Sequence, residues 1–254
     1  MQERYLSPAL HDQDATSRLI APLAGIEAEI YNDLWNAVIE RKLKPGAKIE
    51  ELVLSEIYGV SRTVVRKVLV IMEQEGVVSL PLNRGAYVAS PSFRDAQELL
   101  EATAALLAGI VSELATHPDR ITAEHRQMLS DHARAQRKAE SEQDAYSSLR
   151  LQMEYLILLA VIHDNRLMAG SVERTGNRLA VALSLFQDTP APGGRAEFAE
   201  TLTRHILEGT HAKALAHLQT FIEAVRRTLR PQAVDTAVDL RAILGRRKGE
   251  APGH

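Results

Sequence analysis

Residues 59–66 read Gly-Val-Ser-Arg-Thr-Val-Val-Arg, and this stretch decides the fold of the N-terminal part of the chain. Gly59 ends a predicted helix over residues 50–58, and Ser61 is a residue type that caps helix N-termini. The next helix, over residues 62–75, turns its apolar residues to one face at helical spacing. The sequence therefore predicts two helices joined by a tight turn.

The segments on either side of this pair complete a small domain. Upstream, apolar residues spaced four apart predict an amphipathic helix, and they are Ile26, Ile30, Leu34 and Val38. Downstream, residues 77–80 and 86–88 read as two short strands, and Asn83-Arg84-Gly85 reads as the turn between them. The order helix, helix, helix, hairpin predicts a winged helix-turn-helix domain over residues 20–91.

The remainder of the chain reads as helix and turn. Helical patterns are separated by breaks that contain Pro, Asn or Gly, and they cover residues 93–116, 122–141, 145–163, 165–187, 195–208 and 210–229. We therefore expect a mostly α protein with an all-helical bundle of six or seven helices over residues 92–230. Residues 1–19 are expected to form a flexible N-terminal arm, and residues 231–254 a C-terminal helix, possible over 235–244, followed by a tail.

Composition excludes several classes of protein. The 254 residues include no cysteine, so disulfides, thiolate nucleophiles and cysteine-ligated metal centres are absent. The formal net charge of −3 rules out a uniformly basic nucleic-acid coat but not a local basic patch. The N-terminus lacks the apolar run of a signal peptide, and residues 155–162 are too short to span a bilayer. We expect a cytoplasmic protein without a membrane partner.

Positive charge gathers on the predicted helix over residues 62–75. This helix carries no acid before Glu73, and its first turns hold Arg62, Arg66 and Lys67. Such a helix fits the DNA major groove, where an arginine donates two hydrogen bonds to guanine. The hydroxyls of Ser61 and Thr63 suit phosphates, and Arg84 lies in the predicted wing. The alternative is a solvated basic face on a helical hairpin.

These residues resemble the winged helix of GntR-family bacterial transcription regulators. The resemblance covers about 65 residues and rests on Leu43-Lys44-Pro45-Gly46, Ile49-Glu50-Glu51, residues 59–66, Glu75-Gly76-Val77-Val78 and residues 83–88. It implies DNA contacts by Ser61, Arg62, Thr63 and Arg66, and a wing at Asn83, Arg84 and Gly85 that enters the minor groove; the positive charge of Lys67 adds a contact near the DNA backbone. Three positions depart from the family pattern, namely Leu52, where some members carry an arginine, Val64, where proline is usual, and Lys67, where glutamate is usual. We expect Lys67 to make DNA binding tighter and more sensitive to salt.

The helical remainder resembles the effector-binding and dimerising domain of the FadR subfamily, called the FCD domain. Many members hold a divalent metal there with one Asp and three His, and the matching positions here are Gln152, Leu156, His205 and Phe221. Only His205 keeps a ligand, and Thr103 stands where an arginine-and-glutamate pattern is common. We therefore expect no metal and no cofactor, and an effector that is largely apolar or neutral, or no effector at all. Nearby polar residues that could contact an effector are Arg174, Asn177 and Arg178; alternatively, His205 is a hydrogen-bonded core histidine and the arginines are solvated.

No assembled catalytic group is visible, so we expect that the chain is not an enzyme. The nine histidines are scattered, and neither HExxH, GxSxG nor a phosphate-binding glycine loop occurs. The predicted function is a sequence-specific transcription regulator, with repression as the default. We expect it to bind a palindromic double-stranded DNA operator as a homodimer and to respond to a small-molecule effector. The alternatives are a regulator whose helical domain only dimerises, or a winged-helix protein-interaction module.

Overall fold

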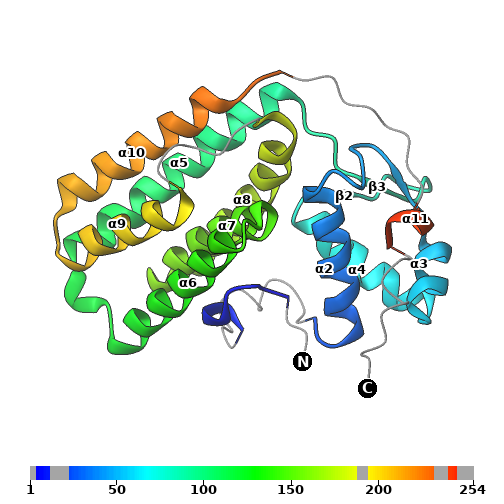
Figure 1. Cartoon of the computed structure of the whole chain (residues 1–254), viewed down its shortest axis with the longest axis horizontal. Coiled ribbons are helices and arrows are strands. Elements are labelled where there is room, and N and C mark those ends of the chain that lie inside the picture. The colour runs from blue at the N-terminus through cyan, green and yellow to red at the C-terminus, as the bar shows by residue number, and fades with distance from the viewer. Residues whose placement is uncertain (1–3, 12–22, 188–193, 232–239, 245–254) are drawn as a thin grey trace. The chain divides into compact units, whose positions relative to one another are not determined.

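The computed structural model describes residues 4–11, 23–187, 194–231 and 240–244 of the chain (Figure 1). These residues form two compact units. The first unit contains Arg4, residues 23–91 and residues 240–244, and the second contains residues 5–11, 92–187 and 194–231.

Three helices build the core of the first unit. They are α2 (Ile26–Ile39), α3 (Glu51–Tyr58) and α4 (Arg62–Gln74), and both α2 and α3 pack against α4. Their inward faces bury Leu34, Trp35 and Leu69 almost completely. The apolar spacing in the sequence predicted this face, because residues three and four apart lie on the same side of a helix.

A three-stranded antiparallel sheet completes the first unit. Its order is β1 (Lys48–Ile49), β3 (Ala86–Val88) and β2 (Val78–Ser79), with Ile49 opposite Ala86 and Val78 opposite Val88. The hairpin of β2 and β3 was predicted, whereas β1 was not. Two residues are too few to show an alternating pattern, so only the tertiary pairing reveals β1.

The short helix α11 (Leu240–Leu244) also belongs to the first unit, where it contacts α2 and α3. It lies within the helix considered at residues 235–244, of which residues 235–239 are outside the described part of the chain.

The second unit is built of helices, as predicted, and its described part also contains an isolated antiparallel β-bridge between Gln187 and Leu229. Its elements are α5 (Phe93–Thr116), the 3-10 helix η2 (Pro118–Arg120), α6 (Ala123–Ser141), α7 (Ala145–Ile162), α8 (Arg166–Phe186), α9 (Arg195–Leu207) and α10 (His211–Thr228). The helix α7 is buried on nearly all sides and contacts α5, α6, α8 and α9. Both α5 and α7 are long and apolar enough to cross a membrane by length and composition; within this unit, the apolar window of α7 is 78% buried and that of α5 is 44% buried. The predicted mostly α fold is confirmed.

Residues 4–11 differ from the expected flexible arm. The 3-10 helix η1 (Pro8–Leu10) lies against α6 and α7 in the second unit, and Leu10 is buried. The backbone N–H groups of Leu6 and Ser7 donate to the Glu154 carboxylate at 3.0 and 2.6 Å. These partners lie almost 150 residues along the chain, so no local pattern indicates them. Residues 1–3 and 12–19 of the expected arm lie outside the described part of the chain.

Candidate functional site

The turn between α3 and α4 sets the position of the candidate recognition helix. Gly59 ends α3 in the left-handed conformation, with φ 66° and ψ 34°. This region is open to glycine at little cost, whereas a β-carbon makes it unfavourable. Ser61 then caps α4, and its hydroxyl accepts a hydrogen bond from the Val64 N–H at 3.4 Å. The helix therefore begins at Arg62, with its first side chains presented to solvent.

Arg62 and Arg66 project from one exposed face of α4. Their side chains are 67% and 66% exposed, and both reach the same carboxylate of Glu51 at the start of α3. The distances are 3.6 Å from Arg62 Nη2 to Glu51 Oε2 and 3.1 Å from Arg66 Nη1 to Glu51 Oε1. One carboxylate cannot neutralise two guanidinium groups, and exposed ion pairs of this kind contribute only about 0–1 kcal/mol. Both arginines are therefore available to a stronger anionic partner.

The other predicted contacts on α4 are exposed as well. Thr63 faces solvent near the helix N-terminus, where backbone N–H groups favour anions. Lys67 pairs with Glu27 of α2, with 2.7 Å between Nζ and Oε2. The extra cation expected from the sequence is present, but it is partly neutralised within its own unit.

The wing presents its tip to solvent. Asn83 and Gly85 hold positive φ angles of 57° and 85°, which gives the tight turn between β2 and β3. Arg84 between them is exposed, as the sequence predicted. Sequence reasoning missed Leu82, which is 87% exposed at this tip. An apolar residue beside a turn motif reads as the end of a strand, so its exposure follows only from the tertiary structure.

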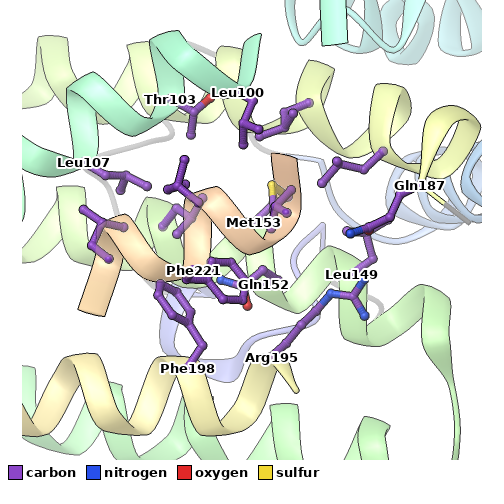
Figure 2. Close-up of a pocket in the computed structure, with 16 residues that line it drawn as sticks. Leu100, Thr103, Leu107, Leu149, Gln152, Met153, Gln187, Arg195, Phe198 and Phe221 are labelled. Carbon is purple, nitrogen blue, oxygen red and sulfur yellow. The ribbon is translucent and has the colours of Figure 1, made fainter. Parts of the chain in front are cut away.

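The second unit contains a small cavity of about 30 Å³ at its centre (Figure 2). Four of the eight predicted effector residues line it, and they are Thr103, Gln152, Leu156 and Phe221. The other four do not line it: Arg174 and Arg178 are exposed on α8, Asn177 is buried elsewhere on that helix, and His205 lies beside the turn into α10. Half of the remaining residues on the cavity wall are leucines, and Met153 and Phe198 lie among the others.

Phe198 takes the place that the sequence assigned to His205. The two residues are seven apart on α9, so they share a helix face two turns from each other. The rings of Phe198 and Phe221 stack with centroids 3.8 Å apart, and Figure 2 shows both at the cavity. His205 instead places Nδ1 3.1 Å from Thr210 Oγ1. The match of His205 to a position in the effector pocket was therefore wrong. Residues seven apart share a helix face, so amphipathic spacing alone cannot tell which of the two lies at the cavity.

These residues do not fit a metal ion. Of the four positions matched to metal ligands, Gln152, Leu156 and Phe221 line the cavity. Leucine and phenylalanine offer no lone pair, so the Gln152 side chain is the one that could ligate a metal there. In the described part of the chain, no group of three or more His, Cys, Asp or Glu side chains is placed to hold a metal.

Arg195 is the cavity residue that sequence reasoning missed. It begins α9 and lines the cavity, whereas the arginines that the sequence placed near the pocket were Arg174 and Arg178. The preceding residues 189–194 read as a linker, so the start of the helix carried no functional signal. Burial lowers the pKa of Arg195, and the nearby Glu140 opposes that effect.

Comparison with known proteins agrees with the geometry of the first unit. Residues 26–88 match the family described as "Bacterial regulatory proteins, gntR family". An uncharacterized HTH-type transcriptional regulator of Agrobacterium vitis, in the TAR-I ttuE-ttuC' intergenic region, is 28% identical over 108 residues. The uncharacterized HTH-type transcriptional regulator YdhC of Bacillus subtilis is 28% identical over 71 residues. These matches span 42% and 28% of this chain, and 63% and 32% of the relatives' own lengths.

Two solved structures share the fold along most of the chain. A GntR transcriptional regulator from Rhodococcus sp. RHA1 has a TM-score of 0.64 at 19% identity, covering 80% of this chain and 96% of the other. The E. coli protein McbR/YncC has a TM-score of 0.62 at 16% identity, covering 89% and 100%. The matched family and both curated relatives are transcriptional regulators rather than enzymes, as the sequence predicted for this chain. Residues 26–88 are thus a domain of the gntR family of bacterial regulatory proteins.

Proposed function

We propose that the protein is a cytoplasmic transcription regulator that binds a palindromic DNA operator as a homodimer. The N-terminal half of α4 enters the major groove, where Arg62 and Arg66 read base edges. Ser61, Thr63 and Lys67 contact phosphates, and the wing residues Asn83, Arg84 and Gly85 follow the adjacent minor groove. Binding within a promoter represses transcription.

One observation carries this proposal. Arg62 and Arg66 lie four residues apart at the start of α4, both about two-thirds exposed, with one carboxylate between them. Neither guanidinium is enclosed by its own unit, so a duplex can take over both groups from Glu51. The exposed wing tip at Arg84 supplies a further cation on the same small domain.

The helical unit is proposed to act as an FCD-type domain of the FadR subfamily that dimerises and binds a small effector. The central cavity, with Thr103, Gln152, Leu156 and Phe221 on its wall, is the proposed effector site. An effector that prefers one arrangement of the helices shifts the population of DNA-binding dimers. A helical unit that only dimerises is the alternative within this class.

A winged helix that contacts proteins is the alternative from another class. The 87% exposure of Leu82 at the wing tip and the 57% exposure of Leu52 on α3 favour it, because exposed apolar side chains suit protein partners. Lys67 on the exposed face of α4 disfavours it, since protein interfaces are depleted in lysine.

Selection from a random pool of duplexes tests the proposal. The purified full-length chain is expected to enrich a sequence with two-fold symmetry, and a gel shift with that duplex is expected to weaken as salt rises. A chain that enriches no sequence and shifts no duplex at low salt would favour the protein-interaction module.

A further inference from the structure

We infer that the central cavity of the helical unit takes an uncharged, mainly apolar molecule that carries a carboxamide or lactam edge. This inference rests on the proposed function, in which the cavity is the effector site. Gln152 and Thr103 supply the polar contacts, and the surrounding leucines supply the apolar ones.

The amide of Gln152 is the feature that selects this chemistry. The residue is 2% exposed in the middle of α7, and neither Nε2 nor Oε1 has a hydrogen-bond partner among the described residues. A buried amide normally has partners for both its donor and its acceptor, because leaving either unpaired is costly. A ligand amide or lactam offers an acceptor and a donor side by side and pairs with both atoms of Gln152 at once.

Thr103 adds a third polar atom to the same cavity. Its hydroxyl is buried on α5 and has no partner among the described residues. Figure 2 shows Thr103 and Gln152 on different helices, both beside the same cavity. A ligand that contacts both residues therefore ties α5 to α7.

The charges around the cavity favour a neutral ligand over a carboxylate. Arg195 is the one charged residue on the described wall of the cavity. Glu140 lies next to its backbone and accepts hydrogen bonds from the N–H groups of Arg195 and Ala196 at 2.8 and 2.9 Å. A second carboxylate brought to Arg195 would meet the charge of Glu140, whereas a neutral group would not.

A ligand must widen the cavity, because about 30 Å³ is far less than a small molecule occupies. The stacked rings of Phe198 on α9 and Phe221 on α10 close it. The helix α10 is the element best able to move, since only Ala214, Leu218 and Val225 of its residues are buried. Insertion of the ligand between the rings shifts α10 outward, so that ligand binding changes the conformation of the helical unit.

The experiment uses the full-length protein with three octyl probes: octanamide, sodium octanoate and 1-octanol. Melting temperature and calorimetric affinity are measured for each probe. Octanamide is expected to raise the melting temperature most, and Gln152→Leu is expected to weaken its affinity by about tenfold or more. The matched control is Gln127→Leu, because Gln127 is exposed on α6, does not line the cavity, and donates from Nε2 to Asp131 Oδ1 at 2.8 Å. This control is expected to keep the octanamide response.

Thr103→Val is the second test variant, in case Gln152→Leu fails to fold. A larger shift with octanoate that is lost in Arg195→Gln would overturn the inference, as would an octanamide response that survives both Gln152→Leu and Thr103→Val. No shift with any probe would overturn it as well. DNA binding is measured separately without probes, so failure of the ligand inference leaves the proposed DNA binding standing, and the reverse also holds.

Discussion

The Glu51 carboxylate lies 3.1 Å from the Arg66 guanidinium, at the exposed junction of α3 and α4. Glu51 belongs to α3 and Arg66 to α4, so this pair links the two helices of the helix-turn-helix. The same carboxylate also reaches Arg62. Glu51 therefore competes with DNA for the guanidinium groups of Arg62 and Arg66.

Glu51→Gln is expected to tighten DNA binding by about threefold to tenfold, because a duplex then displaces no carboxylate from the two arginines. Glu50→Gln is the matched control, since it changes the net charge equally at an exposed neighbouring position. Fluorescence anisotropy with a selected duplex measures both variants. Equal affinities for the two variants would mean that Glu51 does not compete with DNA.

Gly59→Ala is expected to destabilise the first unit by about 1 kcal/mol. The left-handed backbone causes this loss, because an added β-carbon at Gly59 meets no atom within 4 Å. Gly109→Ala is the control: Gly109 lies inside α5, and its added β-carbon would lie 3.8 Å from the Met168 methyl group. That variant is expected to gain about 0.5–1 kcal/mol. Urea unfolding measures both changes, and a stabilised Gly59→Ala would contradict this reading of the turn.

Leu10→Ala is expected to destabilise the helical unit by about 2–5 kcal/mol. Leu10 of η1 is 1% exposed, so truncation leaves a cavity against α6 and α7. Leu167→Ala is the control, because Leu167 is 79% exposed and its loss is expected to change stability by less than about 0.5 kcal/mol. If the two variants unfold at the same urea concentration, the N-terminal segment does not contribute to the helical core.

The stability of the helical unit is expected to depend on pH through His132. Burial lowers its pKa from 6.5 to about 4, and its Nδ1 lies 2.9 Å from Ser7 Oγ. Because the unfolded chain binds this proton more tightly, the stabilising contribution is present above pH 6.5 and is lost as the pH falls through about 4.

The expected loss is about 3 kcal/mol, since each pKa unit is worth about 1.4 kcal/mol. His132→Gln is expected to remove this part of the dependence. The test measures the unfolding free energy of the wild type and of His132→Gln between pH 7 and pH 4. Subtracting one pH profile from the other removes the contribution of the carboxylates that both proteins share. Parallel pH profiles would show that the histidine titrates as it does in the unfolded chain.

The sequence predicted the elements with strong local signals. The helix α4 followed from its apolar spacing, from Gly59 before it and from Ser61 at its cap, because each acts within a few residues. The exposure of Arg62 and Arg66 also agreed with their positions on that helix. The role of Glu51 was not visible, since an ion pair between neighbouring helices depends on their packing.

Features that depend on distant partners could not be predicted. The strand β1 exists through its pairing with β3, and residues 5–11 are fixed by contacts with α6 and α7. The helix α9 itself was predicted correctly from its periodicity. That periodicity could not show that Phe198, rather than His205 two turns later, lies at the cavity. Arg195 lay beside a linker and gave no local sign of its burial.

Salt-dependent DNA binding by the wild type and Arg66→Ala tests the central proposal most directly. With a duplex selected from a random pool, the wild type is expected to bind with an affinity that falls steeply as salt rises. Arg66→Ala is expected to lose about 1–3 kcal/mol of binding free energy, with discrimination between bases relaxed at one position of each half-site. Equal affinity of the two proteins for every duplex, or no binding by the wild type at low salt, would contradict the proposal.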